Sequence, residues 1–115
     1  MKNQANCQIT CKDNFIGRVG APATPASLPE IDLRHVRARV RKESGLSAAA
    51  VRKASHDYLE YWQFIKNSGT AGHDVPSHEV DLIWHAHILF TRQYMEDTEK
   101  YFGHYLHHEP NTRGN

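Results

Sequence analysis

One stretch of sequence, residues 77–89, decides the fold, and it reads SHEVDLIWHAHIL. Its apolar residues spread around the whole circumference of a helix, a pattern typical of a helix that is buried on all sides. These residues are Val80, Leu82, Ile83, Trp84, Ile88 and Leu89. Pro76 and Ser77 form a helix start signal. We therefore expect a central buried helix from about Ser77 to Leu89.

Two helices are predicted before this central helix. The first is short and basic and ends near Gly45, and its apolar residues recur at the spacing of one helical face. They are Leu33, Val36 and Val40. The second begins after Ser47, a good N-cap residue, and continues to about Asn67. Its apolar face carries Val51, Ala54, Tyr58, Leu59, Trp62 and Ile65.

A fourth helix is predicted after the central one. Thr91 can cap its start, and Gly103 suits the left-handed position at its end. Its apolar stripe consists of Tyr94, Met95, Thr98, Tyr101 and Phe102. Beyond it, the chain is expected to continue through His104 to Pro110 in irregular form.

The sequence contains no alternating strand pattern, internal repeat or hairpin signal of the Asn-Gly or Asp-Gly type. The expected fold is therefore all-α, a small four-helix bundle of orthogonal or up-down type with a flexible N-terminal arm. Residues 1–29, which are rich in small residues and proline, are assigned to the arm. Residues 30–110 form the helical domain, and residues 111–115 form a disordered tail.

Length and composition limit the class of protein. At 115 residues, with 39% apolar and 23% charged residues, the chain fits one globular domain. No apolar run approaches the roughly 18 residues of a membrane helix, so no membrane partner is expected. The N-terminus lacks an apolar stretch of signal-peptide length, which favours a cytoplasmic location. Cys7 and Cys11 are expected to be reduced and without a structural role; a bridge between them or a part in a metal site is the alternative.

Histidine is the compositional anomaly. The chain has nine histidines, and seven of them fall between residues 73 and 108. These seven are His73, His78, His85, His87, His104, His107 and His108. Local enrichment of this kind indicates metal binding first.

Helical spacing indicates which donors can converge on one ion. Asp81 and His85 are four residues apart and share a face, whereas His87 points roughly 200° away from His85 on a regular helix. The remaining donors must come from elsewhere, and an antiparallel turn would bring His107 and His108 back beside the central helix.

The hypothesis is a mononuclear site with Asp81, His85 and His108 as ligands and His107 or His87 as a fourth. Two histidines and a carboxylate suit zinc or iron(II). Residues 30–110 would then be a helical metal-binding domain.

The same residues are also compatible with a protein that binds no metal. His85 can be a histidine hydrogen-bonded to Asp81, and the histidines at 104–108 can belong to a solvated tail. Tyr94 is expected in the core, but its hydroxyl would seek a partner such as Asp81 or a metal-bound water. Tyr94 and Asp81 are therefore the candidate catalytic residues.

This part of the chain carries a resemblance to a known family. The pattern comprises Val75-Pro76-Ser77, the run VDLIWHAH at residues 80–87, Thr91, Tyr94, Gly103 and His107-His108. Over about residues 73–110 it resembles the motif block of the glycine-rich domain-containing protein-like family. The resemblance implies a helical domain but no established reaction. The residues of this chain that match the family's motif positions are Asp81, Trp84, His85, His87, Tyr94, Gly103 and His108. Similar proteins often carry a cysteine where this chain has Thr98, and this departure speaks against a cysteine ligand.

The functional hypothesis is a small helical metal-binding protein. Whether it is an enzyme stays open: an oxidoreductase or hydrolase acting on an unknown small molecule would fit the site. Phosphate-loop, nucleophile-elbow and His-Glu-x-x-His motifs are absent from the sequence. The alternative is a non-enzymatic interaction module whose basic helix, Arg34 to Lys42, binds an acidic protein or RNA. Nucleic acid is the less expected partner, because such a face is more often simply solvated.

Overall fold

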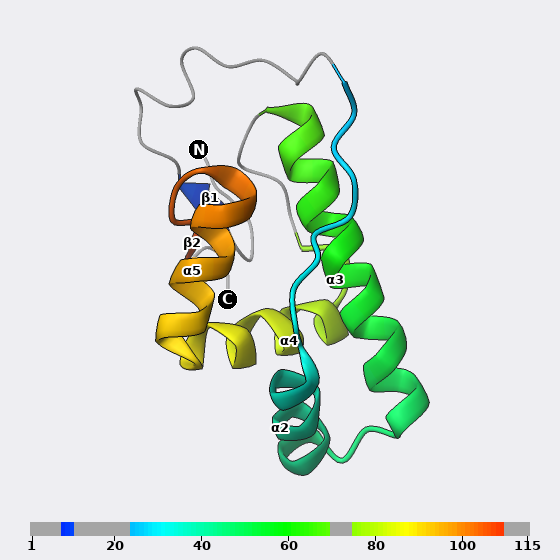
Figure 1. Cartoon of the computed structure of the whole chain (residues 1–115). Helices are drawn as coiled ribbons and strands as arrows, with labels where there is room; N and C mark the ends of the chain where they lie inside the picture. Colours follow the sequence, from blue (N-terminus) through cyan, green and yellow to red (C-terminus); the bar gives the residue numbers. More distant parts are fainter. Residues whose placement is uncertain (1–7, 11–23, 70–74, 110–115) are drawn as a thin grey trace.

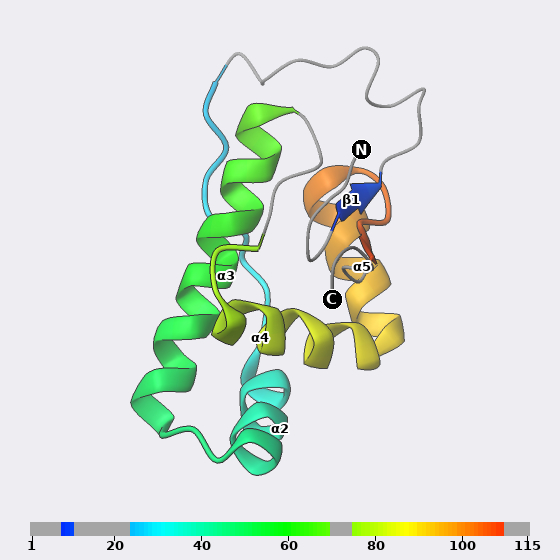
Figure 2. The same cartoon turned by 180° about the vertical axis from the view of Figure 1, so that it is seen from behind.

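The computed structural model of the chain describes residues 8–10, 24–69 and 75–109. Within these ranges the helices are α2 (Arg34–Ser44), α3 (Ala48–Ser68), α4 (His78–Leu89) and α5 (Thr91–Phe102), and the strands are β1 (Gln8–Thr10) and β2 (His107–Glu109). Helix α4 lies crosswise to both α3 and α5 (Figure 1), and the view from behind shows the same arrangement (Figure 2). The predicted all-α four-helix bundle is confirmed, in its orthogonal form.

Side-chain and backbone caps explain where the helices begin and end. The hydroxyl of Ser47 accepts a hydrogen bond from the Ala50 amide at 3.0 Å, and that of Ser77 accepts one from the Val80 amide at 3.1 Å. Gly103 ends α5 with a φ of 88°, a left-handed conformation that favours glycine. Thr91 is not a cap, because Phe90 holds that position and Thr91 is already the first residue of α5.

Helix α4 is the centre of the packing, as its sequence predicts, because it packs against α2, α3 and α5. It contributes Val80, Ile83, Trp84, Ala86 and His87 to the buried interior. The predicted inner faces of α2 and α3 are buried as well, apart from the partly buried Leu59. Leu89 and Met95 are exceptions, with 58% and 45% of their surfaces exposed. Of the helices that the structure describes, none has the length and apolar character needed to cross a membrane.

The segment before α2 is held against two helices. Gln63 of α3 donates a hydrogen bond to the carbonyl of Ala26 at 2.8 Å, and the hydroxyl of Tyr101 on α5 donates one to the carbonyl of Ser27 at 2.7 Å. Residues 24–29 therefore differ from the flexible arm expected for them. Several predictions fall on residues outside the described ranges. They concern Cys7 and Cys11, His73, the disordered tail at 111–115 and most of the arm.

The last described segment is ordered rather than irregular. Leu106 is fully buried, and β2 pairs with β1 in antiparallel register, with Ile9 opposite His108. The expected irregular course from His104 to Pro110 is therefore wrong for residues 107–109. A strand of three residues is too short to show an alternating pattern, and its partner lies almost a whole chain away in sequence.

Candidate metal centre

Three potential metal ligands converge between α4 and β2. Asp81 and His85 lie one turn apart on α4, and His108 is the middle residue of β2. Nε2 of His108 lies 2.8 Å from Oδ1 of Asp81, and Nδ1 of His85 lies 3.6 Å from Oδ2 of the same carboxylate. Each residue offers one ligand atom within 4.8 Å of the other two. Helix α4 thus positions Asp81 and His85, and the pairing of β2 with β1 helps to position His108.

The cluster is enclosed on one side and open on the other. The side chain of His108 is only 1% exposed, and its ring packs against Trp84 with centroids 4.1 Å apart. The side chain of Asp81 is 23% exposed and that of His85 is 56% exposed. The His85 and His108 rings are stacked, with centroids 4.5 Å apart. Solvent therefore reaches the group from the side of His85.

The electrostatic surroundings favour neutral imidazole at His85. Partial burial lowers the pKa of His85, and the neighbouring His108 and His78 lower it further, while Asp81 acts in the opposite direction. A metal binds the neutral form of histidine, so this balance leaves His85 ready to act as a ligand near neutral pH.

The spacing of the donors is close to that of a metal site. Nitrogen and oxygen ligands lie at about 2.0–2.2 Å from zinc, so donors on one ion are at most about 4 Å apart. A separation of up to 4.8 Å requires a small inward movement. The half-exposed His85 can rotate out of its stack on His108 to make this movement, since solvent rather than packed protein surrounds its outer side.

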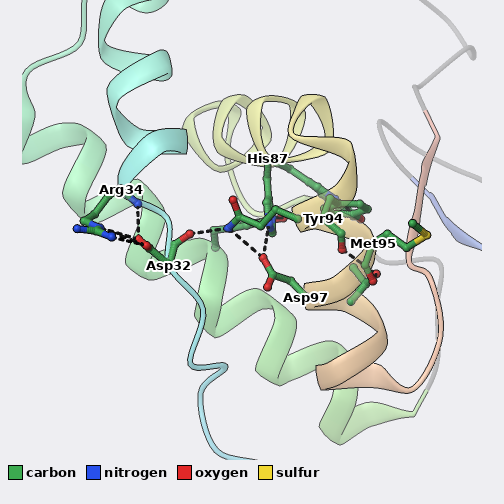
Figure 3. A network of polar contacts seen from close by, with 10 residues as sticks. Asp32, Arg34, His87, Tyr94, Met95 and Asp97 are labelled. Atoms are coloured by element: carbon green, nitrogen blue, oxygen red, sulfur yellow. Dashed lines mark hydrogen bonds and ion pairs between the residues drawn. The ribbon is translucent and has the colours of Figure 1, made fainter.

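His87 lies apart from the cluster, in the core. It is fully buried, and its Nε2 lies 2.9 Å from Oδ2 of Asp97 (Figure 3). Its Nδ1 lies 2.8 Å from the hydroxyl of Tyr58. Because a carboxylate only accepts hydrogen bonds, Nε2 carries the proton and Nδ1 accepts from Tyr58. Burial raises the pKa of Tyr58, which keeps its proton available. Burial also lowers the pKa of His87, although Asp97 opposes the effect. Both nitrogens are thus engaged, and His87 does not supply a fourth ligand in this arrangement.

His107 also lies outside the group. It is exposed, and its ring contacts Tyr105 with centroids 4.8 Å apart. Successive side chains of a strand point to opposite faces, so a strand that directs His108 toward Asp81 directs His107 away from it. Of the five predicted ligands, the structure therefore brings together Asp81, His85 and His108 and leaves His87 and His107 apart.

Tyr94, a predicted catalytic residue, is part of the packing between α4 and β2. It is fully buried, its hydroxyl accepts a hydrogen bond from Nε1 of Trp84 at 2.9 Å, and it donates one to the carbonyl of Leu106. Burial raises its pKa well above the usual value for tyrosine. The expected contact with Asp81 is wrong, because Trp84 and Leu106 are the partners. Tyr94 instead anchors the chain two residues before His108.

Removing the Tyr94 hydroxyl is expected to destabilise the fold. Tyr94→Phe leaves the Trp84 indole N–H and the Leu106 carbonyl in the core without their partner, which should lower the free energy of unfolding by about 1–3 kcal/mol. Urea unfolding followed by tryptophan fluorescence measures this change. Tyr105→Phe serves as the control, since Tyr105 is only partly buried. Equal stability of Tyr94→Phe and the unmodified protein would show that these hydrogen bonds contribute nothing.

Asp97 and Tyr58 belong to a polar network around His87 that the sequence does not predict. Tyr58 fits an apolar helical face, and nothing in its spacing shows that its hydroxyl meets His87, 29 residues away. The sequence contains one weak indication that Asp97 has a buried partner. Asp97 lies next to the buried Thr98, so its carboxylate is at the edge of the inward-facing side of α5. A partner for it could be identified only once the angle between α4 and α5 was known.

Two of the five basic residues of helix α2 form local ion pairs. Arg34 pairs with Asp32 at 2.7 Å, and Arg39 pairs with Glu43 at 3.0 Å. These pairs are largely exposed to solvent. Such an arrangement is typical of a solvated helical face, and binding of an acidic protein or RNA by α2 stays a prediction.

Comparison with known proteins gives the chain a family. No curated protein and no solved structure matches it significantly. The resemblance to the glycine-rich domain-containing protein-like family stays a prediction, because no match bears on it. The sequence profile of the UCP032817-like family matches residues 26–113, which include all four helices and the three clustered side chains. The chain therefore belongs to the UCP032817-like family, whose function is uncharacterised.

Proposed function

We propose that this protein binds one transition-metal ion, zinc or iron(II), through Asp81, His85 and His108. The observation that carries the proposal is the convergence of one carboxylate and two imidazoles within 4.8 Å from two separate elements. Imidazole and carboxylate are suitable ligands for both metals. Ion pairing without a metal could also hold these three side chains together, and measurement of the metal content separates the two possibilities.

The exposure of the cluster favours a reactive site over a purely structural one. Structural zinc sites normally have four protein ligands, whereas catalytic sites keep a position for water or substrate. Three donors converge here, and the side chain of His85 is 56% exposed, so small molecules can approach the ion from that side. Two histidines and one carboxylate with open positions are also the ligand set of many iron(II) oxygenases. We therefore propose a metalloenzyme of oxidoreductase or hydrolase type, in which the metal supplies Lewis acidity or redox chemistry.

The three ligands would have different roles. Asp81 contacts both histidines and would supply the negative charge that a divalent cation requires. His108 would give a fixed position, since its ring packs on Trp84 and the paired strands hold its backbone. His85 would be the adjustable ligand, because its side chain can move toward the ion at little cost in packing.

The untagged protein is expected to carry about one equivalent of a first-row transition metal and to lose stability when the metal is removed. A ligand that binds only the folded state adds RT ln(1 + [L]/Kd) to stability, about 2.7 kcal/mol at a metal concentration 100 times Kd. Elemental mass spectrometry gives the metal content after growth and after reconstitution with zinc, iron(II) or copper. Thermal unfolding with and without a chelator gives the stability change.

Two results would contradict the proposal. One is less than a tenth of an equivalent of every first-row metal after reconstitution. The other is an identical melting temperature for the metal-loaded and chelated forms. Asp81→Asn is a useful companion variant, because it keeps the shape and a hydrogen-bonding oxygen but removes the charge, and it should weaken metal binding without unfolding the protein.

A further inference from the structure

A second group of charged side chains surrounds a cavity of about 470 Å³, and none of the residues lining this cavity belongs to the metal cluster. The extended segment 24–31 forms one wall. Lys66 of α3 and the residues Asp97, Lys100 and Tyr101 of α5 form the other. The cavity therefore lies where the segment before α2 crosses α3 and α5.

The walls of the cavity are fixed by hydrogen bonds from both helices. Gln63 of α3 and Tyr101 of α5 each donate to a backbone carbonyl of the segment, at Ala26 and Ser27. In addition, the amide of Ala26 donates to the side chain of Asn67 at 2.7 Å. The two walls are thus held in place before any ligand arrives, which lowers the entropic cost of binding.

Asp97 presents an oriented carboxylate at this cavity. Its Oδ2 atom accepts a hydrogen bond from Nε2 of His87 at 2.9 Å (Figure 3). It accepts a second one from Nε2 of Gln93 at 3.1 Å. Tyr58 holds the other side of the His87 ring, so the chain of contacts reaches into the core. Among the described residues, the second oxygen of Asp97 accepts no hydrogen bond. That oxygen can therefore accept one from a bound molecule.

The same cavity also offers two ammonium groups. Nζ of Lys66 donates to the carbonyl of Tyr101 and lies 4.6 Å from the centre of the Tyr101 ring. An ammonium group has three donors, so Lys66 retains donors beyond the one that it uses there. Lys100 is exposed and also lines the cavity. The exposed Glu30 adds a second negative charge to the lining.

We propose that this cavity binds a small zwitterion, with the ligand's ammonium group at Asp97 and its carboxylate at Lys66 and Lys100. A ligand with only one charged group can make only one of these two charged contacts. Hydrogen bonds between charged partners are the strong ones, so a molecule that makes both contacts is selected over its singly charged analogues. The position of this site is independent of whether the first cluster binds metal.

The test uses a series of ω-amino acids from glycine to 6-aminohexanoate, each compared with the carboxylate and the amine that lack one of its two charged groups. Binding is followed by amide chemical shifts of the full chain labelled with ¹⁵N. We expect at least one amino acid to shift the amides of Ser27, Lys100 and Tyr101 in a saturable way. It should bind at least about tenfold more tightly than either analogue, because each analogue lacks one of the two charge-assisted hydrogen bonds.

Two variants separate the two halves of the site. Asp97→Asn keeps an oxygen that can accept from His87 and should remove the preference for the amino acid over the simple carboxylate. Lys100→Ala should reduce the preference over the simple amine. Glu96→Gln is the matched control, since it removes one negative charge from an exposed position on α5 outside the cavity, and it should bind as the unmodified protein does.

Either of two outcomes overturns the proposal. One is the lack of saturable shifts with any amino acid of the series. The other is equal affinity for an amino acid and both of its analogues. If Asp97→Asn fails to fold, Lys100→Ala and the analogue series still decide the question.

Discussion

Replacing His108 with alanine is expected to lower metal affinity by more than about 100-fold, since loss of a residue that only orients a ligand already costs 10–100-fold. His108 is the one proposed ligand that α4 does not supply, and its side chain is 1% exposed and packed on Trp84. Without it, Asp81 and His85 remain on an exposed helical face, where two donors bind a metal only weakly. Competition titration with a zinc or iron(II) chromophoric chelator measures the change.

His107→Ala is the matched control for this experiment. His107 is the neighbouring residue of the same strand, it is exposed, and it lies outside the cluster. Its removal should change metal affinity less than threefold. Equal losses in the two variants would mean that the strand turns differently in the metal-bound protein or that both histidines are ligands. Affinity unchanged in His108→Ala would contradict the proposed site altogether.

Replacing His87 with alanine is expected to lower the free energy of unfolding by about 3 kcal/mol while leaving metal affinity within a few-fold. The variant opens a cavity in the core and removes the acceptor of the Tyr58 hydroxyl and the donor to Asp97. His87 lies two residues from the proposed ligand His85 on the same helix, so the metal affinities of His87→Ala and His85→Ala can be compared directly. Urea unfolding gives the stability, and the chelator titration used for His108 gives the affinity.

His56→Ala provides the reference for His87. His56 lies exposed on α3, where it pairs with Glu60, and its loss should change stability by less than about 0.5 kcal/mol. If His87→Ala is too unstable to study, His87→Gln keeps two polar groups at the position and should be less damaging. Loss of metal affinity in His87→Ala as large as in His85→Ala would show that His87 is a ligand and that α4 is distorted near Ala86 when metal binds.

The helices could be predicted from sequence because their causes are local. Ser47 and Ser77 cap helices through bonds to amides three residues on, and Gly103 adopts its left-handed conformation within its own turn. The strand β2 could not be predicted, because its stability depends on β1, at the opposite end of the chain. Pairing over such a distance leaves no periodicity in a segment of three residues.

In the candidate metal site, too, the features with local causes could be predicted from sequence, and those that depend on distant contacts could not. Asp81 and His85 converge through helical spacing alone, and the same spacing separates His87 from them. His108 was expected as a ligand and His107 as a possible fourth, but placing His107 outside the cluster required the direction of a strand that was not expected. Tyr58 and Asp97 could not be predicted as partners of His87, because they meet it only where α3 and α5 cross α4 in the folded protein. The partners of Tyr94 differed from expectation for a similar reason, since Leu106 offers a backbone carbonyl that no side-chain pattern reveals.

The pairing of β1 with β2 has a consequence for the order in which the protein assembles. Helix α4 can form from local contacts, and Tyr94 holds Leu106 close to it, but the strand that carries His108 gains its partner only after residues 8–10 and 107–109 have met, and closing so long a loop is slow and entropically costly. The pocket for the ion would thus be completed late in folding, after most of the hydrophobic interior has formed. A metal bound at that stage would connect β2 to α4 and slow the unfolding of the protein. The lifetime of the folded state would then depend on the supply of the ion.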